Sequence, residues 1–288
     1  MDDIRLSTLM DLEKIERGIF RGQSWDLGLP ALFGGQVLGQ ALSAAYATVD
    51  GERFAHSLHT YFLLPGDAKT PVVYDVERVR DGKSFSTRRV EAIQNGKVIF
   101  YMTASFQTVE GELSHQHGKF PQAPDPETLE PDIRFYEKNY EHIPASLREA
   151  LIYHKPIDTR TVHPGASDSA SDTTDIQASR RIWIRAKDDL GDNLKLHQAV
   201  LAYASDYRFL TTALQPHSIS MSDPRLKIAT IDHAMWFHRP VNVNEWLLYV
   251  MESPSGGNSR GFVRGQIFSR DGDLLASTSQ EGLMRLSG

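Results

Sequence analysis

The chain contains no cysteine among its 288 residues, which excludes disulfide bonds, thiolate metal sites and a cysteine nucleophile. It also lacks any excess of positive charge, since the formal net charge is -6 at pH 7 and the pI is about 6.0. Without a basic surface the chain has no general attraction to nucleic acid or to anionic membranes, so we expect no nucleic-acid partner. The composition is typical of a soluble globular protein with one large domain or two of ordinary size.

Targeting signals are absent as well. The N-terminus, Met1-Asp2-Asp3, lacks the basic-then-apolar order of a signal peptide, and the C-terminus, Leu286-Ser287-Gly288, lacks the Ser-Lys-Leu peroxisomal address. One long stretch without charged residues, Leu27 to Val49, contains Pro30, Gln36 and several glycines. It therefore predicts a buried helix after a glycine turn rather than a membrane span. We expect a cytoplasmic protein with no membrane partner.

The first half shows helices followed by strands. Apolar residues at helical spacing predict a short amphipathic helix over residues 5–20, and a second helix is expected over 33–46, where small residues allow a sheet to approach closely. Strands are expected at residues 56–63, 72–79, 84–94 and 98–109. Asn95-Gly96 between the last two strands is a strong hairpin signal. This order favours an α+β fold over alternating βαβ units.

The middle of the chain differs in composition from both ends. Residues 118–179 are rich in proline, serine and aspartate, and a short helix is expected only near 146–152. We therefore predict a linker at 118–179 between an N-terminal unit, 1–117, and a C-terminal unit, 180–288.

The second unit repeats the first. Residues 237–240 align with 62–65, and the turn at 270–273 aligns with the turn at 94–97 at nearly the same offset. A helix from Leu194 and one aromatic strand over 228–240 are expected in this unit. Two helix-plus-sheet units with their sheets joined edge to edge are the predicted architecture.

A carboxylate lies on the apolar stripe of the second-unit helix. Asp206 follows Tyr203 by three residues and precedes Leu210 by four, so a helix would carry it toward the core or a pocket. Burying an ionised carboxylate there costs free energy unless a polar group hydrogen-bonds to it. On its own, Asp206 also fits a helix C-terminal residue with a salt-bridge or hydrogen-bond partner, and both interpretations stay open.

Several long matches in the correct order resemble the acyl-CoA thioesterase II family. They are residues 33–41 (FGGQVLGQA), 56–62 (HSLHTYF), 228–233 (IATIDH) and 279–282 (SQEG). The resemblance extends from about Leu12 to Arg285 and is weakest in the linker. It implies a double hotdog fold, hydrolysis of acyl-CoA thioesters of broad, medium to long chain length to a free fatty acid and CoA, no cofactor, and a homodimer or homotetramer.

The resemblance also implies a catalytic set. An aspartate at the end of the second helix, a threonine on the following strand and a glutamine near the C-terminus fall on Asp206, Thr230 and Gln280. Because a thiolate leaves with little help, thioester hydrolysis needs chiefly a positioned water and no covalent nucleophile. Apolar surroundings would raise the pKa of Asp206 toward useful basicity, while the other two side chains offer donors and acceptors that orient the water.

Two glycines and a histidine are candidates for substrate binding. Free backbone N–H groups at the helix start near Gly34 and Gly35 could receive a carbonyl oxygen or an oxyanion. His56 could help to bind substrate or shape the pocket of the other half, and it is expected on the opposite strand face from His59, an odd number of residues away. CoA carries phosphates, for which several arginines are available: Arg78, Arg80, Arg88, Arg89, Arg260 and Arg264.

Other chemistries find less support. Asp232 and His233 are strand neighbours that should face opposite sides, so His233 is expected to pack beside Trp236 and Phe237 or to bind a backbone carbonyl. No His-Glu-x-x-His spacing occurs, so we predict no catalytic metal, and the absence of Gly-x-Ser-x-Gly argues against an α/β-hydrolase. Two alternatives remain: a hydratase or dehydratase of the same fold, and a non-catalytic acyl-CoA-binding sensor.

Overall fold

The structure, a computed structural model, describes residues 5–111, 113–118, 120–143, 148, 156–162, 178–217, 219 and 223–287. The helix expected near residues 146–152 lies, apart from Arg148, outside the described residues, as does the serine-rich part of the predicted linker at 165–175.

The N-terminal half begins differently from the sequence prediction. Residues 5–20 do not form one helix: a short helix, α1 (Leu6–Met10), is followed by a hairpin of two strands, β1 (Glu13–Glu16) and β2 (Ile19–Gly22). Gly18 between them has a φ of 82°, a left-handed conformation that glycine adopts without strain and that ends any helix. The helical spacing of the apolar residues therefore gave the wrong element after Met10.

The remaining elements of this half follow the prediction closely. They are α2 (Gly34–Tyr46), β3 (Arg53–Phe62), β4 (Val72–Asp81), β5 (Phe85–Gln94) and β6 (Lys97–Thr108). Asn95 and Gly96 both have positive φ at the turn between β5 and β6, as the Asn-Gly hairpin signal requires.

Part of the predicted linker is regular structure that packs on the C-terminal half. It contains η1 (Pro126–Thr128), α3 (Asp132–Lys138), η2 (Tyr140–His142) and β7 (Ile157–Val162). β7 pairs with β8, the first strand of the predicted C-terminal unit, so residues 157–162 extend that unit's sheet rather than linking two sheets. Asp132 anchors α3 on β7, because its carboxylate accepts hydrogen bonds from Thr159 and Thr161.

The C-terminal half repeats the first with one difference from the prediction. Its elements are β8 (Ser179–Ala186), α5 (Leu194–Ser205), η3 (Leu210–His217), β9 (Leu226–Thr230), β10 (Asp232–Phe237), β11 (Leu247–Gly257), β12 (Arg260–Phe268) and β13 (Leu274–Leu286). The single strand expected over residues 228–240 is two strands, broken at Ile231, whose N–H donates to the Glu281 carbonyl oxygen at 2.9 Å. This break proves important for the candidate site.

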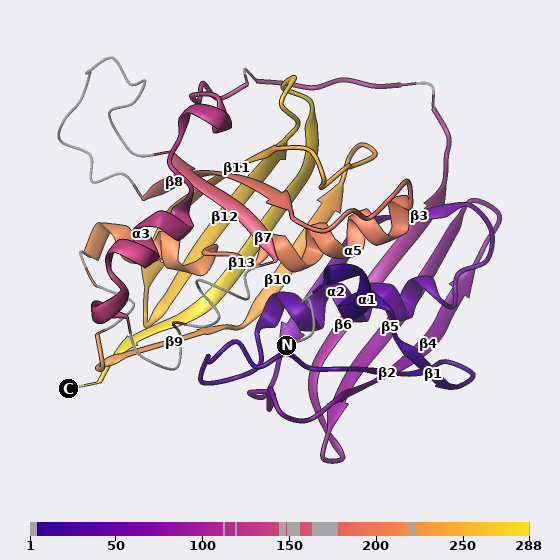
Figure 1. Ribbon diagram of the computed structural model, residues 1–288. Helices are drawn as coiled ribbons and strands as arrows, with labels where there is room; N and C mark the ends of the chain where they lie inside the picture. The colour runs from indigo at the N-terminus through magenta and orange to yellow at the C-terminus, as the bar shows by residue number, and fades with distance from the viewer. Residues whose placement is uncertain are drawn as a thin grey trace.

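One antiparallel sheet of 13 strands joins the two halves. Its order is β1-β2-β4-β5-β6-β3-β10-β13-β12-β11-β8-β7, with β9 pairing to β13. The halves meet where β3 pairs with β10, which confirms the predicted edge-to-edge junction. In Figure 1, α2 and α5 lie side by side in front of this sheet, at the junction of the indigo-to-purple and orange-to-yellow halves.

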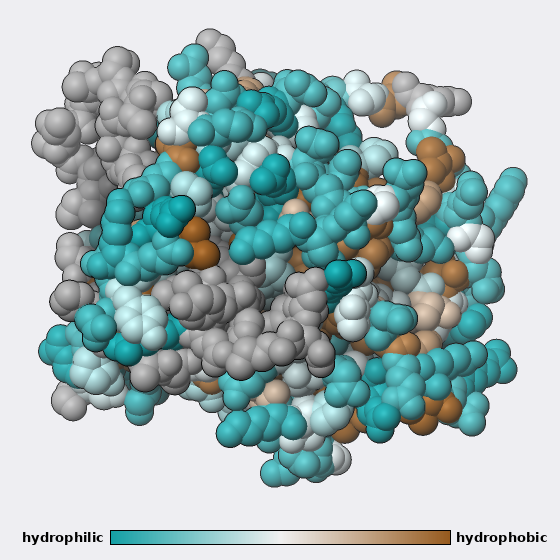
Figure 2. All heavy atoms as spheres, in the orientation of Figure 1, coloured by the Kyte–Doolittle hydropathy of each residue, from teal (hydrophilic) through white to brown (hydrophobic). Residues whose placement is uncertain are grey.

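A large hydrophobic core contains residues of the two helices and of the sheet from both halves. A smaller cluster of Val162, Trp183, Trp246, Leu248 and Phe268 has Phe120 and Leu129 packed against it. On the face shown in Figure 2, hydrophobic residues are scattered among hydrophilic ones. Among the described residues, no helix has both the length and the apolar character needed to cross a membrane.

Candidate active site

The site begins with the contact between α2 and α5. An added Cβ on Gly35 would lie 2.3 Å from the Tyr203 carbonyl oxygen, and one on Gly39 would lie 2.9 Å from the Ala199 carbonyl oxygen. Only glycine permits so close an approach. The small residues of α2 therefore allow α5 to approach closely, whereas the sequence analysis expected them to allow the close approach of a sheet. The pairing of positions makes the helices antiparallel, so the N-terminus of α2 meets the C-terminus of α5.

Asp206 lies at this meeting point as the C-cap residue of α5. An added Cβ on Gly34 would lie 2.8 Å from its Oδ2 atom. Burial raises the pKa of Asp206 from 3.8 to about 7, and hydrogen bonds from the Gly35 backbone N–H and the Gln280 side chain act in the opposite direction with smaller effect. The direction agrees with the expectation from its apolar surroundings. A carboxyl group that titrates near neutral pH is suited to general base catalysis.

Gln280 connects the three predicted catalytic residues. It is fully buried on β13, and its Nε2 donates a 2.7 Å hydrogen bond to Oγ1 of Thr230, the last residue of β9. The same side chain hydrogen-bonds to Asp206. The structure therefore brings Asp206, Thr230 and Gln280 together, from a helix end and two strands that lie far apart in the sequence.

His233 belongs to the same cluster, and the sequence analysis did not place it there. It is buried, with Nδ1 2.9 Å from Gln280 Oε1 and Nε2 3.0 Å from Ser205 Oγ. Burial lowers the pKa of His233 to about 4, although the hydrogen bond with Gln280 raises it, so the ring is neutral near pH 7. Its ring packs edge-on against Phe209 instead of the expected Trp236 and Phe237.

The break at Ile231 explains why His233 was missed. Thr230 and His233 are three residues apart and would face opposite sides of a regular strand. Because the strand is interrupted between them, both side chains reach the Gln280 amide. Asp232 does face away as predicted, since its carboxylate accepts a hydrogen bond from the Glu281 N–H at 2.8 Å. The sequence analysis did not predict the break, although Asp232, of a residue type that is depleted in strands, follows it directly.

His56 lies apart from this cluster. It is the extra residue of a β-bulge in β3, and its Nε2 lies 2.8 Å from Ser105 Oγ, with Phe85 packed edge-on against its ring. Ser105 shares a sheet face with Thr103, the cross-strand partner of His59. The bulge thus places His56 and His59 on the same face, and the expectation of opposite faces is wrong.

Within residues 5–111 and 113–117, the described part of the N-terminal half, the positions equivalent to this cluster hold no carboxylate, hydroxyl and amide trio. The position of Asp206, the C-cap of α5, corresponds to Ala47, the C-cap of α2. The position of Thr230, which pairs with Gly282 on β13, corresponds to Ala55, which pairs with Phe106 on β6. In the same register, Ala104 on β6 lies opposite Leu58 on β3. This pair corresponds to Gln280 and His233 in the C-terminal half. The counterparts of Asp206, Thr230 and Gln280 are therefore Ala47, Ala55 and Ala104.

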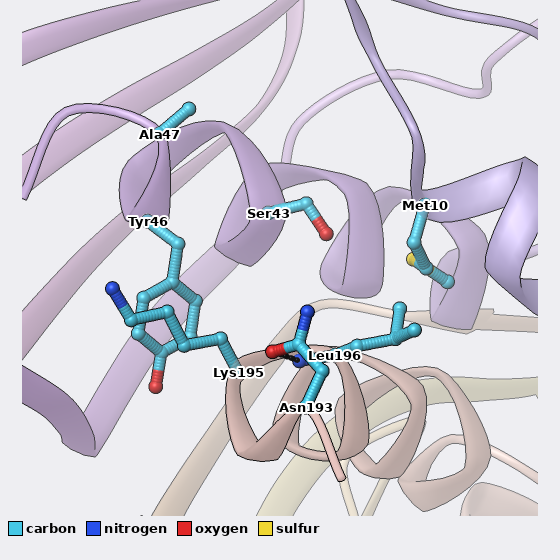
Figure 3. A pocket seen from close by; sticks show the side chains of 7 residues that line it. All are labelled: Met10, Ser43, Tyr46, Ala47, Asn193, Lys195 and Leu196. Carbon is cyan, nitrogen blue, oxygen red and sulfur yellow. Dashed lines mark hydrogen bonds between the residues drawn. The ribbon is translucent and has the colours of Figure 1, made fainter. Parts of the chain in front are cut away.

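Two side chains, Tyr46 and Arg88, lie in the N-terminal counterpart of the site. The Tyr46 hydroxyl donates to Gln198 Oε1 and accepts a 2.7 Å hydrogen bond from the Ala55 N–H, so it occupies the space beside the Thr230 counterpart. Tyr46 also borders a cavity of about 260 Å³ (Figure 3). Because the helices are antiparallel, this end of α2 lies away from Asp206, which is at the other end of the helix pair. The cavity is lined by Met10, Ser43, Tyr46, Ala47, Asn193, Lys195 and Leu196.

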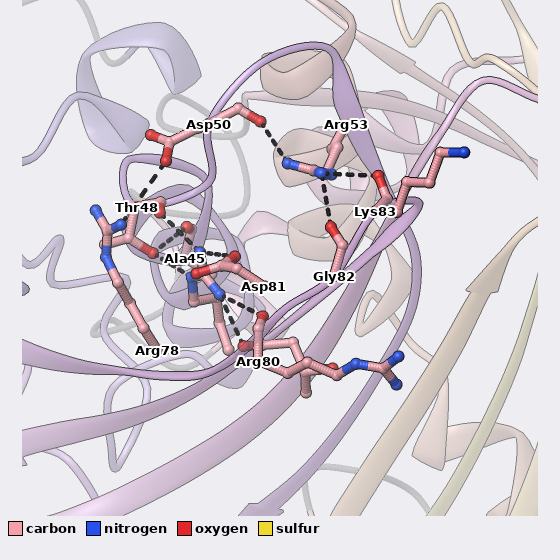
Figure 4. A network of polar contacts seen from close by, with 11 residues as sticks. Ala45, Thr48, Asp50, Arg53, Arg78, Arg80, Asp81, Gly82 and Lys83 are labelled. Carbon is pink, nitrogen blue, oxygen red and sulfur yellow. Dashed lines mark hydrogen bonds and ion pairs between the residues drawn. The ribbon is translucent and has the colours of Figure 1, made fainter.

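Arg88 is the second side chain in the N-terminal counterpart of the site, and it is fully buried near the end of α2. Its guanidinium donates to Thr48 Oγ1 and to the Thr48 carbonyl oxygen, both at 2.9 Å, and to Asp81 Oδ1 at 2.6 Å. Thr48 and Asp81 belong to the polar network in Figure 4. A cation at a helix C-terminus is favourable, so this end of α2 holds a positive charge where α5 has a carboxylate. Burial also excludes Arg88 from the arginines considered for CoA phosphates.

Metal ligation finds no support in the described part of the chain, where no three histidine, aspartate or glutamate side chains lie close enough to hold an ion. The chain contains two units, each an antiparallel sheet packed around a helix, and this architecture defines a double hotdog protein. The carboxylate, hydroxyl and amide gathered where the helices meet form a candidate hydrolytic site.

Comparisons with known proteins agree with this class. A family model described as "Acyl-CoA thioesterase" matches residues 146–283, and one described as "Acyl-CoA thioesterase N-terminal domain" matches residues 22–107. The chain is 41% identical to acyl-CoA thioesterase 2 of Haemophilus influenzae over 100% of both chains. The chain belongs to the acyl-CoA thioesterase family.

Solved structures confirm the predicted fold class. The crystal structure of the acyl-CoA thioesterase II TesB2 from Mycobacterium marinum matches with a TM-score of 0.79 and 40% identity, covering 98% of this chain and 99% of that one. A protein of unknown function with a hot dog fold from Alicyclobacillus acidocaldarius matches with a TM-score of 0.77, covering 98% of both chains. At 21% identity, this second likeness supports the fold alone.

Proposed function

We propose that this thioesterase hydrolyses medium- to long-chain acyl-CoA thioesters to free fatty acid and CoA by direct attack of water. The observation that carries the proposal is the position of Asp206, a carboxylate with a pKa of about 7 that is joined through the Gln280 amide to the Thr230 hydroxyl. These groups together offer a base, a donor and an acceptor around one point. A single water molecule bound there would be both oriented and activated.

The reaction balances with these groups alone. Asp206 accepts a proton from the water as the water oxygen bonds to the thioester carbonyl carbon, and the carbonyl oxygen becomes an oxyanion. The oxyanion then re-forms the C=O bond as the carbon–sulfur bond breaks. The thiolate of CoA leaves and takes the proton from Asp206, which restores the carboxylate. No covalent enzyme intermediate forms.

The start of α2 supports two parts of this mechanism. The Gly35 N–H binds Asp206 and holds the carboxylate in place. We assign the Gly34 N–H of the first turn to the thioester carbonyl oxygen, because it carries part of the positive charge of the helix terminus. The next N–H groups are used within the protein, since Gly35 binds Asp206 and the Gln36 N–H donates to the Phe33 carbonyl oxygen at 3.1 Å. Gly34 fits this assignment, since its missing side chain leaves room directly beside Asp206 and the Phe62 ring.

The alanine counterparts of the trio favour one catalytic site in each chain. The N-terminal position has no carboxylate at the helix end, and Tyr46 and Arg88 occupy its surroundings. The role predicted for His56 in substrate binding stays a prediction, with the described contacts of this residue confined to the exposed sheet face.

The dehydratase alternative is less well supported. It would need an aspartate and a histidine converging on the substrate, whereas His233 is buried and faces Gln280 and Ser205. The sensor alternative would not need the aligned carboxylate, hydroxyl and amide. Thiol release from short, medium and long acyl-CoAs tests the proposal, with kcat/KM expected to rise from short to medium and long chains. Consumption of an enoyl-CoA without thiol release would favour the dehydratase, and no turnover of any acyl-CoA would favour the sensor.

We further propose that the enzyme works in the cytoplasm as a homodimer or homotetramer. Exposed aromatic side chains on the outer sheet face, such as Tyr61 and Trp236, are available for contact between copies. Analytical ultracentrifugation would distinguish the dimer from the tetramer, and a monomer at micromolar concentration would contradict the proposal.

A further inference from the structure

The orientation of the Gln280 amide decides whether the proposed site works. An amide group has nearly identical shape when its oxygen and nitrogen exchange places, so its hydrogen-bond partners select the orientation. In the structure, Nε2 faces Thr230 and Asp206, and Oε1 faces His233. Turned by half a rotation, the amide would present its oxygen to the ionised Asp206. It would then repel the carboxylate and stop donating to Thr230.

His233 supplies the partner for the working orientation. A neutral imidazole has one donor and one acceptor nitrogen. With the proton on Nδ1, the ring donates to Gln280 Oε1 at 2.9 Å, and Nε2 accepts from the Ser205 hydroxyl at 3.0 Å. The Ser205 hydroxyl has a single hydrogen, for which the Ala202 carbonyl oxygen at 2.8 Å competes.

The other tautomer gives the opposite result. With the proton on Nε2, the ring donates to Ser205, whose hydrogen then goes to the Ala202 carbonyl oxygen. Nδ1 becomes an acceptor and would draw the NH2 group of Gln280 away from Thr230 and Asp206. The state of one buried ring is therefore coupled to the orientation of the water-binding amide.

We propose that His233, as the Nδ1–H tautomer, is a positioning residue that holds the Gln280 amide with its NH2 group toward Asp206 and Thr230. The inference rests on the proposed function. His233 acts through Gln280, since the described polar contacts of its ring nitrogens are with Gln280 and Ser205 and not with the carboxylate itself.

Two further observations support this role. The residue is held in place, because Thr60 Oγ1 donates to the main-chain carbonyl oxygen of His233 at 2.9 Å and Phe209 packs edge-on against its ring. In the N-terminal half, where the catalytic set is replaced by alanines, the counterpart of His233 is Leu58 opposite Ala104. The histidine and the glutamine thus occur together in the half with the carboxylate and are both apolar in the half without it.

Two substitutions of His233 by amide residues distinguish the functions of its two ring nitrogens. The side-chain nitrogen of His233→Asn reaches the position of Nδ1 and can still donate to Gln280. His233→Gln reaches the position of Nε2 and keeps only the contact with Ser205. His233→Leu copies the N-terminal counterpart and keeps neither, and His238→Gln, a change to a half-exposed histidine that binds Ser277, is the matched control.

We expect kcat for acyl-CoA hydrolysis to fall on the order of 10- to 100-fold in His233→Gln and His233→Leu, with little change in KM. His233→Asn should retain clearly more activity than either, and the control should match wild type. The hydrogen bond from Gln280 lowers the pKa of Asp206, so the acidic limb of the kcat profile should move to higher pH in the Gln and Leu variants. Equal losses in the Asn and Gln variants, or losses without this displacement, would overturn the inference.

A measurement on the unaltered protein keeps the inference testable if the variants fail to fold. Nitrogen-15 chemical shifts of His233 report the tautomer directly, and we expect a protonated Nδ1; a protonated Nε2 would overturn the proposal. Asp206→Asn separates this inference from the proposed function. If Asp206→Asn is inactive while His233→Gln matches wild type, only the role of His233 fails. Full activity in Asp206→Asn would instead contradict the mechanism itself.

Discussion

Gly34 and Asp206 meet across the two halves of the chain, since a methyl group on the Gly34 Cα would lie 2.8 Å from Asp206 Oδ2 and 3.1 Å from the Phe62 ring. The carboxylate of the C-terminal half therefore depends on the missing side chain of the N-terminal half. This relationship makes the two halves one functional unit, although only one of them carries the polar trio.

Gly34→Ala should displace the Asp206 carboxylate and lower kcat by about 10- to 100-fold, because small errors in the position of a catalytic group are costly. Gly111→Ala is the matched control, since an added Cβ there meets no atom within 4 Å. Steady-state thiol release from both variants, with folding checked by circular dichroism, measures the effect. Equal activity in the two variants would show that the carboxylate tolerates the methyl group.

The pH profile of kcat should report Asp206. Burial raises its pKa to about 7, and only the ionised form can accept a proton from water. The rate should therefore be half-maximal near that pH and fall about tenfold for each unit below it. A profile that stays flat down to about pH 5 would mean that the group acting as base has an ordinary carboxyl pKa.

The same shift predicts a stability cost. The folded-state pKa of about 7 lies above the ordinary value of 3.8, so between these values the folded protein keeps a proton that the unfolded chain has released. Stability is then lost as pH rises from about 4 to 7, and the cost stays constant above that range. Asp206→Asn should raise the free energy of unfolding at pH 8 by up to about 4 kcal/mol.

Urea denaturation of wild type and Asp206→Asn at several pH values measures this effect. The difference in the free energy of unfolding between the two proteins should shrink as pH falls through the same window. A variant less stable than wild type at pH 8 would show that the hydrogen bonds from Gly35 and Gln280 outweigh the cost of burying the charge.

The three proposed catalytic residues, Asp206, Thr230 and Gln280, should act as a unit. Thr230→Ala and Gln280→Ala each disturb the same water in our account, so either change combined with Asp206→Ala should cost little more than Asp206→Ala alone. A double-mutant cycle in kcat/KM measures the coupling. Multiplicative losses would indicate that the residues contribute separately and do not hold a shared water.

Periodic features of the structure could be predicted from the sequence. Local sequence signals mark the Asn-Gly turn, the α2 and α5 helices and the repeat of 62–65 at 237–240. These signals were enough to predict two similar units whose sheets join edge to edge. Its spacing placed Asp206 on the apolar stripe of a helix, but the selection of Asp206, Thr230 and Gln280 as a catalytic set came from the family resemblance. The contact of Thr230 with Gln280 forms between β9 and β13, and no local pattern specifies it.

Irregular features could not be predicted in the same way. The bulge at His56 and the break at Ile231 each lie in an extended segment without a glycine or proline to mark them. Both result from how neighbouring strands pair, and both decide which face a histidine occupies. The position of His233 beside Gln280 was therefore invisible in the sequence, because strict alternation pointed it away from Thr230.

The central claim is that Asp206 is the base that activates water, and kcat of Asp206→Asn tests it most directly. Asp232→Asn is the matched control, because Asp232 is a nearby carboxylate that binds the Glu281 N–H outside the cluster. We predict that kcat for acyl-CoA hydrolysis falls by about 10²- to 10⁴-fold in Asp206→Asn with little change in KM, while Asp232→Asn stays close to wild type. Wild-type kcat in Asp206→Asn would contradict the account.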